Sequence, residues 1–483
     1  MALPDTRALK HAAIDAYVHD LADPNLFYLD RTESQYRLMY QGYSIHFSRP
    51  DANTGQGGGV MAYEVIAVGP ESVSYSTDLP DPGLVAKFDE IRSEIDALVA
   101  PFADMPGPSD FHAYMDTVAS VMGCLATSEA GGGSVLGDHI TELEGIASSG
   151  RLEGDFFVAF KSSFVYPFRD AVIRYYGVAM ALGAALGGEQ GLWDNMQKSV
   201  DDTVDRAAKA FKAHSEESAF DWNEIIWLLT VMADGLSLFA GVAALGAQAE
   251  VALPVEAIAA GITLVTDVLP HSDDPAPAST FDTLMTAFSG DIAKIISDSA
   301  TQEDWLKSSL SSSYDATFGD RWKPSNGFAG QPIDQRATWG STQLKVLDEA
   351  CKRLYESPDG LLPSMAGFLE SARGTVESMT DSTKWYRDDS LGDGPKGCWE
   401  DWDTLRQRLQ NLLKDLWWQT DKAATILRDV VAAFRHADQD AAGDLTSLED
   451  QLSRGSGVPH ESPHRGPTRW IDHVHSEGGI GGY

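Results

Sequence analysis

Hydrophobic positions recur at intervals of three and four residues toward the C-terminal end of the chain, and they predict one long helix. The spacing has a single phase slip near Thr420, and neither glycine nor proline interrupts it. A helix over residues 402–441 would be about 60 Å long at about 1.5 Å per residue, and it could not bury its own apolar stripe. We therefore expect a coiled-coil-like pairing with another helix. The stripe consists of Trp402, Leu405, Leu409, Leu412, Leu416, Ala423, Leu427, Val430, Phe434, Ala437 and Ala441.

The same helical spacing runs through most of the preceding sequence. Two of the segments, Phe156–Leu186 and Leu192–Ala213, are expected to form an antiparallel hairpin that turns at Gly187-Gly188. The segment 362–388 is expected to be the antiparallel partner of the long helix. The other predicted helices cover 84–99 (ended by the prolines of 101–108), Phe111–Leu125, 138–148, Phe281–Leu310 and 340–356.

The first eighty residues have a different pattern. An amphipathic opening segment from Leu9 to Val18 favours a helix, whereas Tyr36–Phe47 and Met61–Val68 are aromatic and β-branched and could pair as strands across Gly57-Gly58-Gly59. This glycine run lacks the Gly-Lys-Ser/Thr that would follow in a phosphate loop, so we interpret it as a flexible turn. The predicted fold class is mainly α: elongated helical-bundle hairpins with a small irregular or β-hairpin N-terminal segment.

Polar stretches rich in glycine and proline suggest that the chain has four parts. They are an N-terminal irregular or β-hairpin segment (1–82), a helical domain (83–316), a C-terminal helical hairpin domain (337–452) and a disordered tail (453–483). The first helical domain contains an apolar hairpin at 225–269. Charged residues divide that hairpin, and its longest uncharged stretch, Gly235–Ala249, is shorter than the ~20 residues of a spanning helix. A buried core hairpin is the favoured interpretation, and conditional membrane contact is the alternative.

Composition excludes several classes of protein. With 36 basic and 72 acidic residues, the formal charge of −36 argues against nucleic-acid binding and favours a soluble protein or a basic partner. Three scattered cysteines, Cys124, Cys351 and Cys398, form neither a disulfide framework nor a cysteine zinc site. The first residues carry no secretory signal pattern, so we expect the chain to fold in the cytoplasm.

No strong catalytic motif occurs, and we predict no catalytic residue, no cofactor and no bound metal. Asp138-His139 with Glu142 and Glu144 is interpreted as a solvated helix face. Histidines in the tail (His460, His464, His473 and His475) would have to order that segment to bind a metal. The tryptophans are interpreted as core residues, although adjacent Trp417 and Trp418 point about 100° apart and one of them should be exposed.

The long helix resembles that of a known family. Its pattern is Trp402-x-x-Leu405, Leu412-Leu413, Leu416, Ala423-Ala424, Leu427-Arg428, Ala432-Ala433-Phe434, Ala437-Asp438 and Ala441-Ala442. This is similar to actinobacterial type VII (ESX) secretion substrates, the WXG-type and ESX-associated helical-hairpin proteins. In that family, export depends on a Tyr-x-x-x-Asp/Glu element after a helical hairpin. The resemblance implies that Phe434 and Asp438 form the export signal here, with Phe in place of Tyr. The alternative is that Phe434 is the last core residue of the stripe and Asp438 is a solvated charge.

Two departures limit the resemblance. The turn before the long helix lacks Trp-x-Gly and has Gly392–Gly397 followed by Cys398-Trp399, and the chain is much longer than the minimal members. A large secreted or cell-surface protein of this system, or one associated with it, fits better than a small partner protein.

The functional hypothesis is a non-enzymatic helical protein that acts by helix-mediated partner binding or self-assembly. Its expected partners are a type VII secretion ATPase or a helical protein, and a homo-oligomer is possible. The expected helix interface consists of Trp402, Leu405, Leu409, Leu412, Leu416, Leu427 and Val430. The alternative is a membrane-active or pore-forming protein that uses the 225–269 hairpin. An enzyme site assembled from distant residues is a third interpretation that local motifs leave open.

Overall fold

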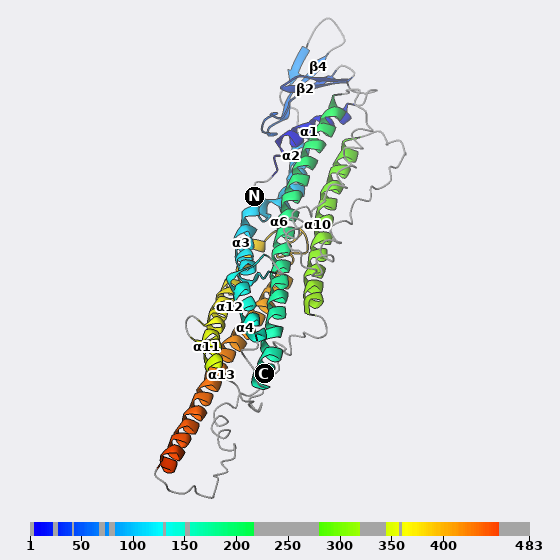
Figure 1. Ribbon diagram of the computed structural model, residues 1–483. Coiled ribbons are helices and arrows are strands. Elements are labelled where there is room, and N and C mark those ends of the chain that lie inside the picture. Colours follow the sequence, from blue (N-terminus) through cyan, green and yellow to red (C-terminus); the bar gives the residue numbers. More distant parts are fainter. Residues whose placement is uncertain are drawn as a thin grey trace, which may run out of the picture. The chain divides into compact units, whose positions relative to one another are not determined.

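The fold is given by a computed structural model of the full chain (Figure 1). It describes residues 4–22, 28–40, 43–66, 73–76, 83–128, 132–149, 155–216, 280–318, 344–356 and 360–453. The chain divides into two compact units, Met1–Ala423 and Ala424–Tyr483. The described residues are mainly α-helical with a small N-terminal sheet, so the predicted fold class is confirmed.

The helices of the first unit account for most of its described residues. They are α1 (Arg7–Leu21), α2 (Leu84–Val99), α3 (Pro108–Leu125), α4 (Val135–Ser148), α5 (Asp155–Phe160), α6 (Tyr166–Ser215), α10 (Phe281–Phe318), α11 (Leu344–Tyr355), α12 (Leu361–Glu377) and the beginning of α13 (Trp399–Ser453). Short helical turns occur at η1 (Ala100–Asp104), η2 (Lys161–Val165) and η6 (Ser382–Trp385). The predicted helix in the opening segment is confirmed as α1.

A five-stranded antiparallel meander follows α1. Its strands, in both sequence and spatial order, are β1 (Tyr28–Arg31), β2 (Gln35–Tyr40), β3 (Tyr43–Ser48), β4 (Gly59–Ile66) and β5 (Val73–Ser76). The predicted pairing across the glycine run is confirmed, because β3 pairs with β4 across the loop that contains Gly57 and Gly58. The prediction of one strand over Tyr36–Phe47 was wrong: that segment holds most of β2 and β3, which pair with each other.

A buried carboxylate joins this sheet to α1. Asp15, only 3% exposed, accepts hydrogen bonds from the Tyr36 hydroxyl and from Nε of Arg49 at 2.8 Å, and Arg31 lies 3.7 Å away. Burial and the negative charge of Asp15 raise the pKa of Tyr36, so this hydroxyl keeps its proton and remains a donor. The sheet is therefore held to the helices by polar contacts as well as by the buried Phe47.

Helix α6 is the centre of the first unit and packs against α1, α3 and α10. It runs without a break through Gly187-Gly188, so the predicted turn and hairpin at that point were wrong. Gly187 has open space around it, but a Cβ on Gly188 would lie 2.7 Å from Cδ2 of Leu306 on α10. The missing side chain at Gly188 lets the two helices approach closely, a use of glycine that local sequence does not separate from a turn.

A proline explains the irregular start of α6. The chain is helical from Asp155, but residues Lys161–Val165 are in π-helical conformation just before Tyr166 and Pro167. Proline has no backbone N–H to donate to the preceding turn, and a π-bulge accommodates the lost bond. Among the described residues, one helical segment, Phe157–Ser215, is long and apolar enough to cross a membrane. In its most apolar stretch 72% of the residues are buried inside the protein, and a buried core helix meets the same criteria.

Helix α12 is shorter than predicted. The sequence indicated a helix over 362–388, but α12 ends at Glu377, and the chain then forms η6 and a loop up to α13. Gly392, Gly394 and Gly397 have positive φ values there, which other residues rarely adopt. Nη1 of Arg406 on α13 donates to the carbonyl of Val376 at 3.2 Å, so the end of α12 contacts α13. Antiparallel pairing of the two helices along their lengths stays a prediction.

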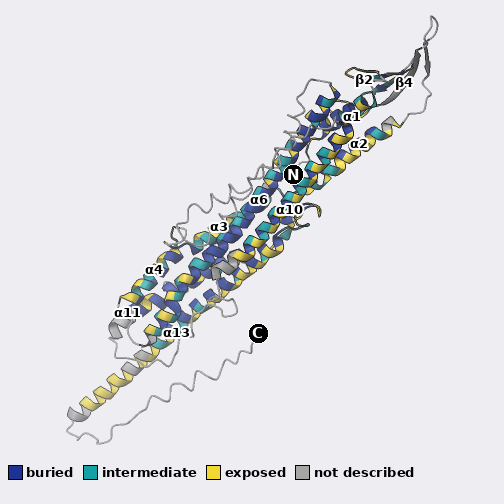
Figure 2. Cartoon of the chain, turned by 90° about the vertical axis from the view of Figure 1, so that its right-hand side faces the viewer, coloured by how far each residue is buried: buried dark blue, intermediate teal, exposed yellow. Residues whose placement is uncertain are grey.

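Helix α13 contains the whole predicted stripe, and Figure 2 shows its burial changing along its length. The apolar 225–269 hairpin, residues 319–336 between the two predicted helical domains, and the tail from Arg454 all lie outside the described residues. The membrane alternative therefore depends on a segment about which the structure says nothing.

Candidate functional site

Among the described residues of the first unit, three fully buried charged side chains come together where α6, α10 and the loop before α13 meet. Glu189 comes from the middle of α6, Glu303 from α10 and Arg387 from the loop, and all three side chains are completely buried. We call this the Glu189–Glu303–Arg387 cluster. Two carboxyl groups and one guanidinium excluded from water need close polar partners, because burying an unpaired charge is costly.

Each carboxyl group has specific partners. Glu189 accepts hydrogen bonds from Nε1 of Trp193 and from Sγ of Cys398, both at 3.0 Å. Glu303 forms an ion pair with Arg387 and accepts a hydrogen bond from the backbone N–H of Asp393. These bonds connect two helices to a loop that is distant from them in sequence.

The guanidinium of Arg387 is held by the loop itself. Its Nε donates to the carbonyl oxygens of Leu391 at 3.1 Å and Gly394 at 3.0 Å, and its Cζ lies 4.5 Å from the centre of the Trp193 ring. A Cβ on Gly392 would overlap the Glu303 carboxyl group, and one on Gly397 would overlap the guanidinium. The loop glycines thus allow the backbone to wrap around buried charges.

The electrostatics of the cluster follow from its charge count. Burial raises the pKa of Glu303 to about 9, with repulsion from Glu189 adding to the shift and Arg387 opposing it. At neutral pH Glu303 is therefore protonated, which reduces the charge repulsion inside the cluster. Burial also raises the pKa of Cys398, with the charge of Glu189 acting in the same direction, so the thiol stays protonated and donates to Glu189.

The buried geometry of the cluster suits it to holding the loop in place and not to acting on a substrate. A substrate cannot reach side chains that have no exposed surface, and a protonated buried thiol is a poor nucleophile. What the cluster can do is fasten the loop at 386–398 to α6 and α10. Since α13 begins at Trp399, the cluster fixes where that helix starts.

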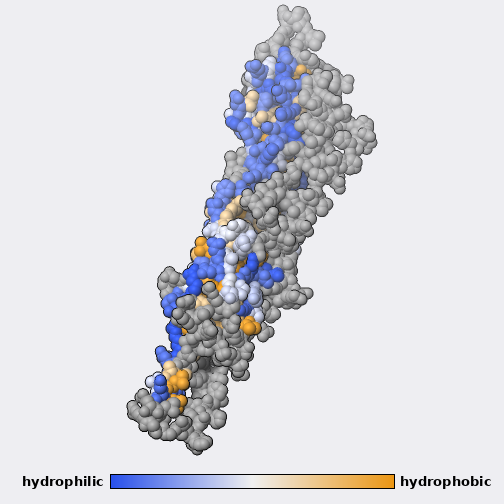
Figure 3. All heavy atoms as spheres, viewed as in Figure 1, coloured by the Kyte–Doolittle hydropathy of each residue, from blue (hydrophilic) through white to orange (hydrophobic). Residues whose placement is uncertain are grey.

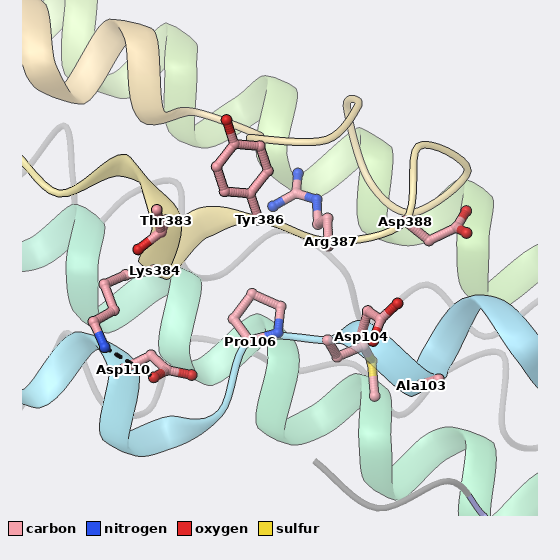
Figure 4. A pocket seen from close by; sticks show the side chains of 10 residues that line it. Ala103, Asp104, Pro106, Asp110, Thr383, Lys384, Tyr386, Arg387 and Asp388 are labelled. Atoms are coloured by element: carbon pink, nitrogen blue, oxygen red, sulfur yellow. Dashed lines mark ion pairs between the residues drawn. The ribbon is translucent and has the colours of Figure 1, made fainter.

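A polar cavity of 530 Å³ lies beside this loop (Figure 4). Residues from η1 and the start of α3 form one side and residues from η6 and the loop form the other. An ion pair of 3.6 Å between Lys384 and Asp110 crosses it. The remaining lining residues are Ala103, Asp104, Met105, Pro106, Thr383, Tyr386, Arg387 and Asp388. Acidic groups outnumber cations in the lining, so the cavity offers a surface suited to a basic group.

The predicted interface residues lie on the buried side of α13. Trp402, Leu405, Leu409, Leu412, Leu416 and Leu427 are all buried. Trp402 donates from Nε1 to the carbonyl of Leu182 at 3.1 Å and stacks on Tyr114. Val430 is only half-buried, and its neighbour Val431 is buried instead. Trp418 is 54% exposed and Trp417 half-buried, which confirms that one of the pair is exposed.

The two residues of the expected export signal lie in the second unit. Phe434 and Asp438 stand one turn apart along the α13 backbone, and their side chains are outside what the structure describes. Every side chain that is described from Ala432 to Glu449 is exposed. The signal is therefore on a helical stretch whose described neighbours face solvent.

The acidic region of α4 has ordinary structural partners. Glu142 forms two hydrogen bonds with Arg353 of α11, at 2.6 and 2.8 Å, and Glu144 pairs with Arg169 of α6 at 2.8 Å. The His139 ring lies 5.9 Å from that of Phe368, and burial lowers its pKa. These carboxylates join helices together and are not grouped around His139 as ligands.

Comparisons of this chain with protein-family models, curated proteins and solved structures give no match. Functional assignment therefore rests on the residues themselves. Sequence reasoning missed the Glu189–Glu303–Arg387 cluster, because its members stand alone in the sequence. The one available signal was the Gly-Asp-Gly-Pro-Lys-Gly turn at 392–397, which was recognised as a turn without a reason for its glycines.

Proposed function

We propose that this protein is a non-enzymatic helical protein exported by, or associated with, a type VII secretion system, and that the distal part of α13 (residues 432–453) binds its partner. It would fold in the cytoplasm and act outside the cell or at its surface. The main observation behind this proposal is that α13 continues as a helix from Ala432 to Glu449, where every described side chain is exposed.

Physical chemistry supports a binding role for this stretch. Helices that gain nothing from tertiary packing are marginally stable in water, so a partner that covers one face would stabilise it. Two large hydrophobic side chains, Leu445 and Leu448, are 66% and 41% exposed and stand three residues apart, on one helical face. On the side of the molecule in Figure 3, hydrophobic groups are scattered among hydrophilic ones over the described residues.

The charge of the distal helix indicates what kind of partner would fit. Residues 432–453 contain five carboxylates (Asp438, Asp440, Asp444, Glu449 and Asp450) and one arginine, Arg435. A partner surface with basic residues around an apolar groove would complement them, in the manner of helix-in-groove recognition. A secretion ATPase or a helical partner protein with such a surface meets this requirement.

The test is export in the native host. Replacing Phe434 and Asp438 together by alanine should remove most of the protein from the culture medium and leave it in the cells. The matched control replaces His436 and Asp440, which lie on the same turns of the same helix and are exposed. Normal export of the control together with loss of the first variant supports the proposal, whereas normal export of both would refute it.

A further inference from the structure

Three helix ends meet at a group of potential metal ligands. His19 and Asp20 lie in the last turn of α1, and His214 lies in the last turn of α6. One possible ligand atom from each of the three side chains lies within 4.8 Å of the other two. Among the described residues, these three therefore form a cluster that could hold a metal ion. The backbone N–H of Phe281, the first residue of α10, donates to the same Asp20 carboxylate.

We propose that His19, Asp20 and His214 bind one divalent transition-metal ion, with zinc as the physiological candidate. Two imidazoles and one carboxylate are a ligand set that zinc uses where three protein ligands leave a position for water or a further ligand. The set is distinct from the Glu189–Glu303–Arg387 cluster and from distal α13, so the inference is independent of the proposed function.

Distances in the group are close to those that coordination needs. Ligand atoms about 2.0–2.1 Å from a tetrahedral zinc ion lie about 3.3 Å apart. Nε2 of His214 is now 2.6 Å from Oδ1 of Asp20, and the rings of His19 and His214 are 5.1 Å apart between centres. Moving the three ligand atoms onto a metal therefore takes shifts of about 1 Å, within the reach of side-chain rotation.

The surroundings prepare the carboxylate for this role. The hydrogen bond from Phe281 holds Oδ2 of Asp20 and leaves Oδ1 directed at His214, which is the kind of outer contact that orients metal ligands. Asp20 is 29% exposed and His214 9%, which leaves a route for an ion from solvent.

Binding would tie the ends of α1 and α6 to the start of α10. A metal that binds only the folded chain stabilises it by mass action, so added zinc should raise the unfolding temperature. The alternative reading of the same geometry is a hydrogen-bonded helix cap in which Asp20 accepts from the Phe281 N–H and pairs with His214. The two readings differ in one residue, His19, which a cap does not require.

The experiment is calorimetric titration of the full-length chain with zinc chloride. Histidines of the tail are first replaced by glutamine in every sample, so that His460, His464, His473 and His475 cannot bind the ion. The proposal predicts one equivalent of zinc per chain, and cobalt in its place should give a visible spectrum without thiolate charge-transfer bands.

The decisive variant is His19→Ala, which keeps the hydrogen bonds of Asp20 to His214 and Phe281. It should fold without metal as the parent does and bind zinc at least about tenfold more weakly. His214→Ala should lose binding as well, and His112→Ala, an exposed histidine on α3, should not. No saturable binding by the parent, or undiminished binding by His19→Ala, would overturn the proposal and leave a helix cap.

Discussion

The two parts of α13 carry similar apolar spacing and have opposite environments. From Trp402 to Leu416 the stripe is buried in the first unit, whereas from Ala432 to Glu449 every described side chain is exposed. In Figure 2 the same helix passes from buried to exposed. An apolar stripe thus predicts a helix reliably, but whether the helix serves the core or a partner depends on what the rest of the chain brings to it.

The largest contrast should come from removing one hydrophobic side chain from each part. Trp402 has no exposed surface and stacks on Tyr114, so Trp402→Ala should lower the free energy of unfolding by about 3–5 kcal/mol. Leu448→Ala should change it by no more than about 0.5 kcal/mol, because Leu448 is 41% exposed. Chemical denaturation followed by circular dichroism measures the unfolding free energy of both variants, and tryptophan fluorescence gives a second measurement for Trp402→Ala. Equal effects would mean that the distal part belongs to the core.

A comparable loss is expected where the loop before α13 is anchored. Arg387→Met leaves Glu189 and Glu303 buried without a cation and should cost about 3–5 kcal/mol in unfolding free energy. Adding Glu303→Gln should restore little of that loss at neutral pH, since Glu303 is already protonated there. Denaturant titrations of the single and double variants measure the coupling. A double variant that is less stable than Arg387→Met would show that Glu303 stabilises the fold by other contacts.

The features that could be predicted from the sequence are those that depend on residues close together along the chain. Helical spacing identified α13, α2, α3 and α10, because each pattern lies within one segment. It failed at Gly188, whose role depends on Leu306, and at α12, whose end is followed by a loop held by Arg387 and Glu303. Glu189 had no recognisable signal in the sequence, because its partners Arg387 and Cys398 are remote from it along the chain. Spatial pairing of this kind is not encoded in local periodicity.

A pH effect is expected in the core and not in the distal helix. The pKa of Glu303 rises from its ordinary 4.5 to about 9 in the folded protein. Between these values the native state holds a proton that the unfolded chain has released, so stability falls as pH rises, by at most about 1.4 kcal/mol per pH unit. Glu303→Gln should remove this fall and be the more stable protein near pH 9. Denaturation of both proteins at several pH values tests this, and parallel pH profiles would contradict it.

The smallest contrast concerns two helical glycines. Gly443 in the distal part has open space around it, so Gly443→Ala should increase helicity and stabilise that stretch locally by about 0.5–1 kcal/mol. Gly188→Ala gains the same propensity but places a methyl group against Leu306, so its benefit should be cancelled or reversed. Hydrogen exchange of the two helices reports each effect separately. If both substitutions stabilised their helices by the same amount, the contact between α6 and α10 would have space for a methyl group at Gly188.

The central claim is that distal α13 serves recognition and proximal α13 serves the fold. The most direct measurement takes one protein, the full-length Phe434→Ala/Asp438→Ala variant, and determines both its secreted fraction in the native host and its unfolding free energy after purification. The account predicts that secretion is lost while the unfolding free energy stays within about 0.5 kcal/mol of the parent. Unchanged secretion, or a loss of secretion that accompanies a loss of stability, would contradict it.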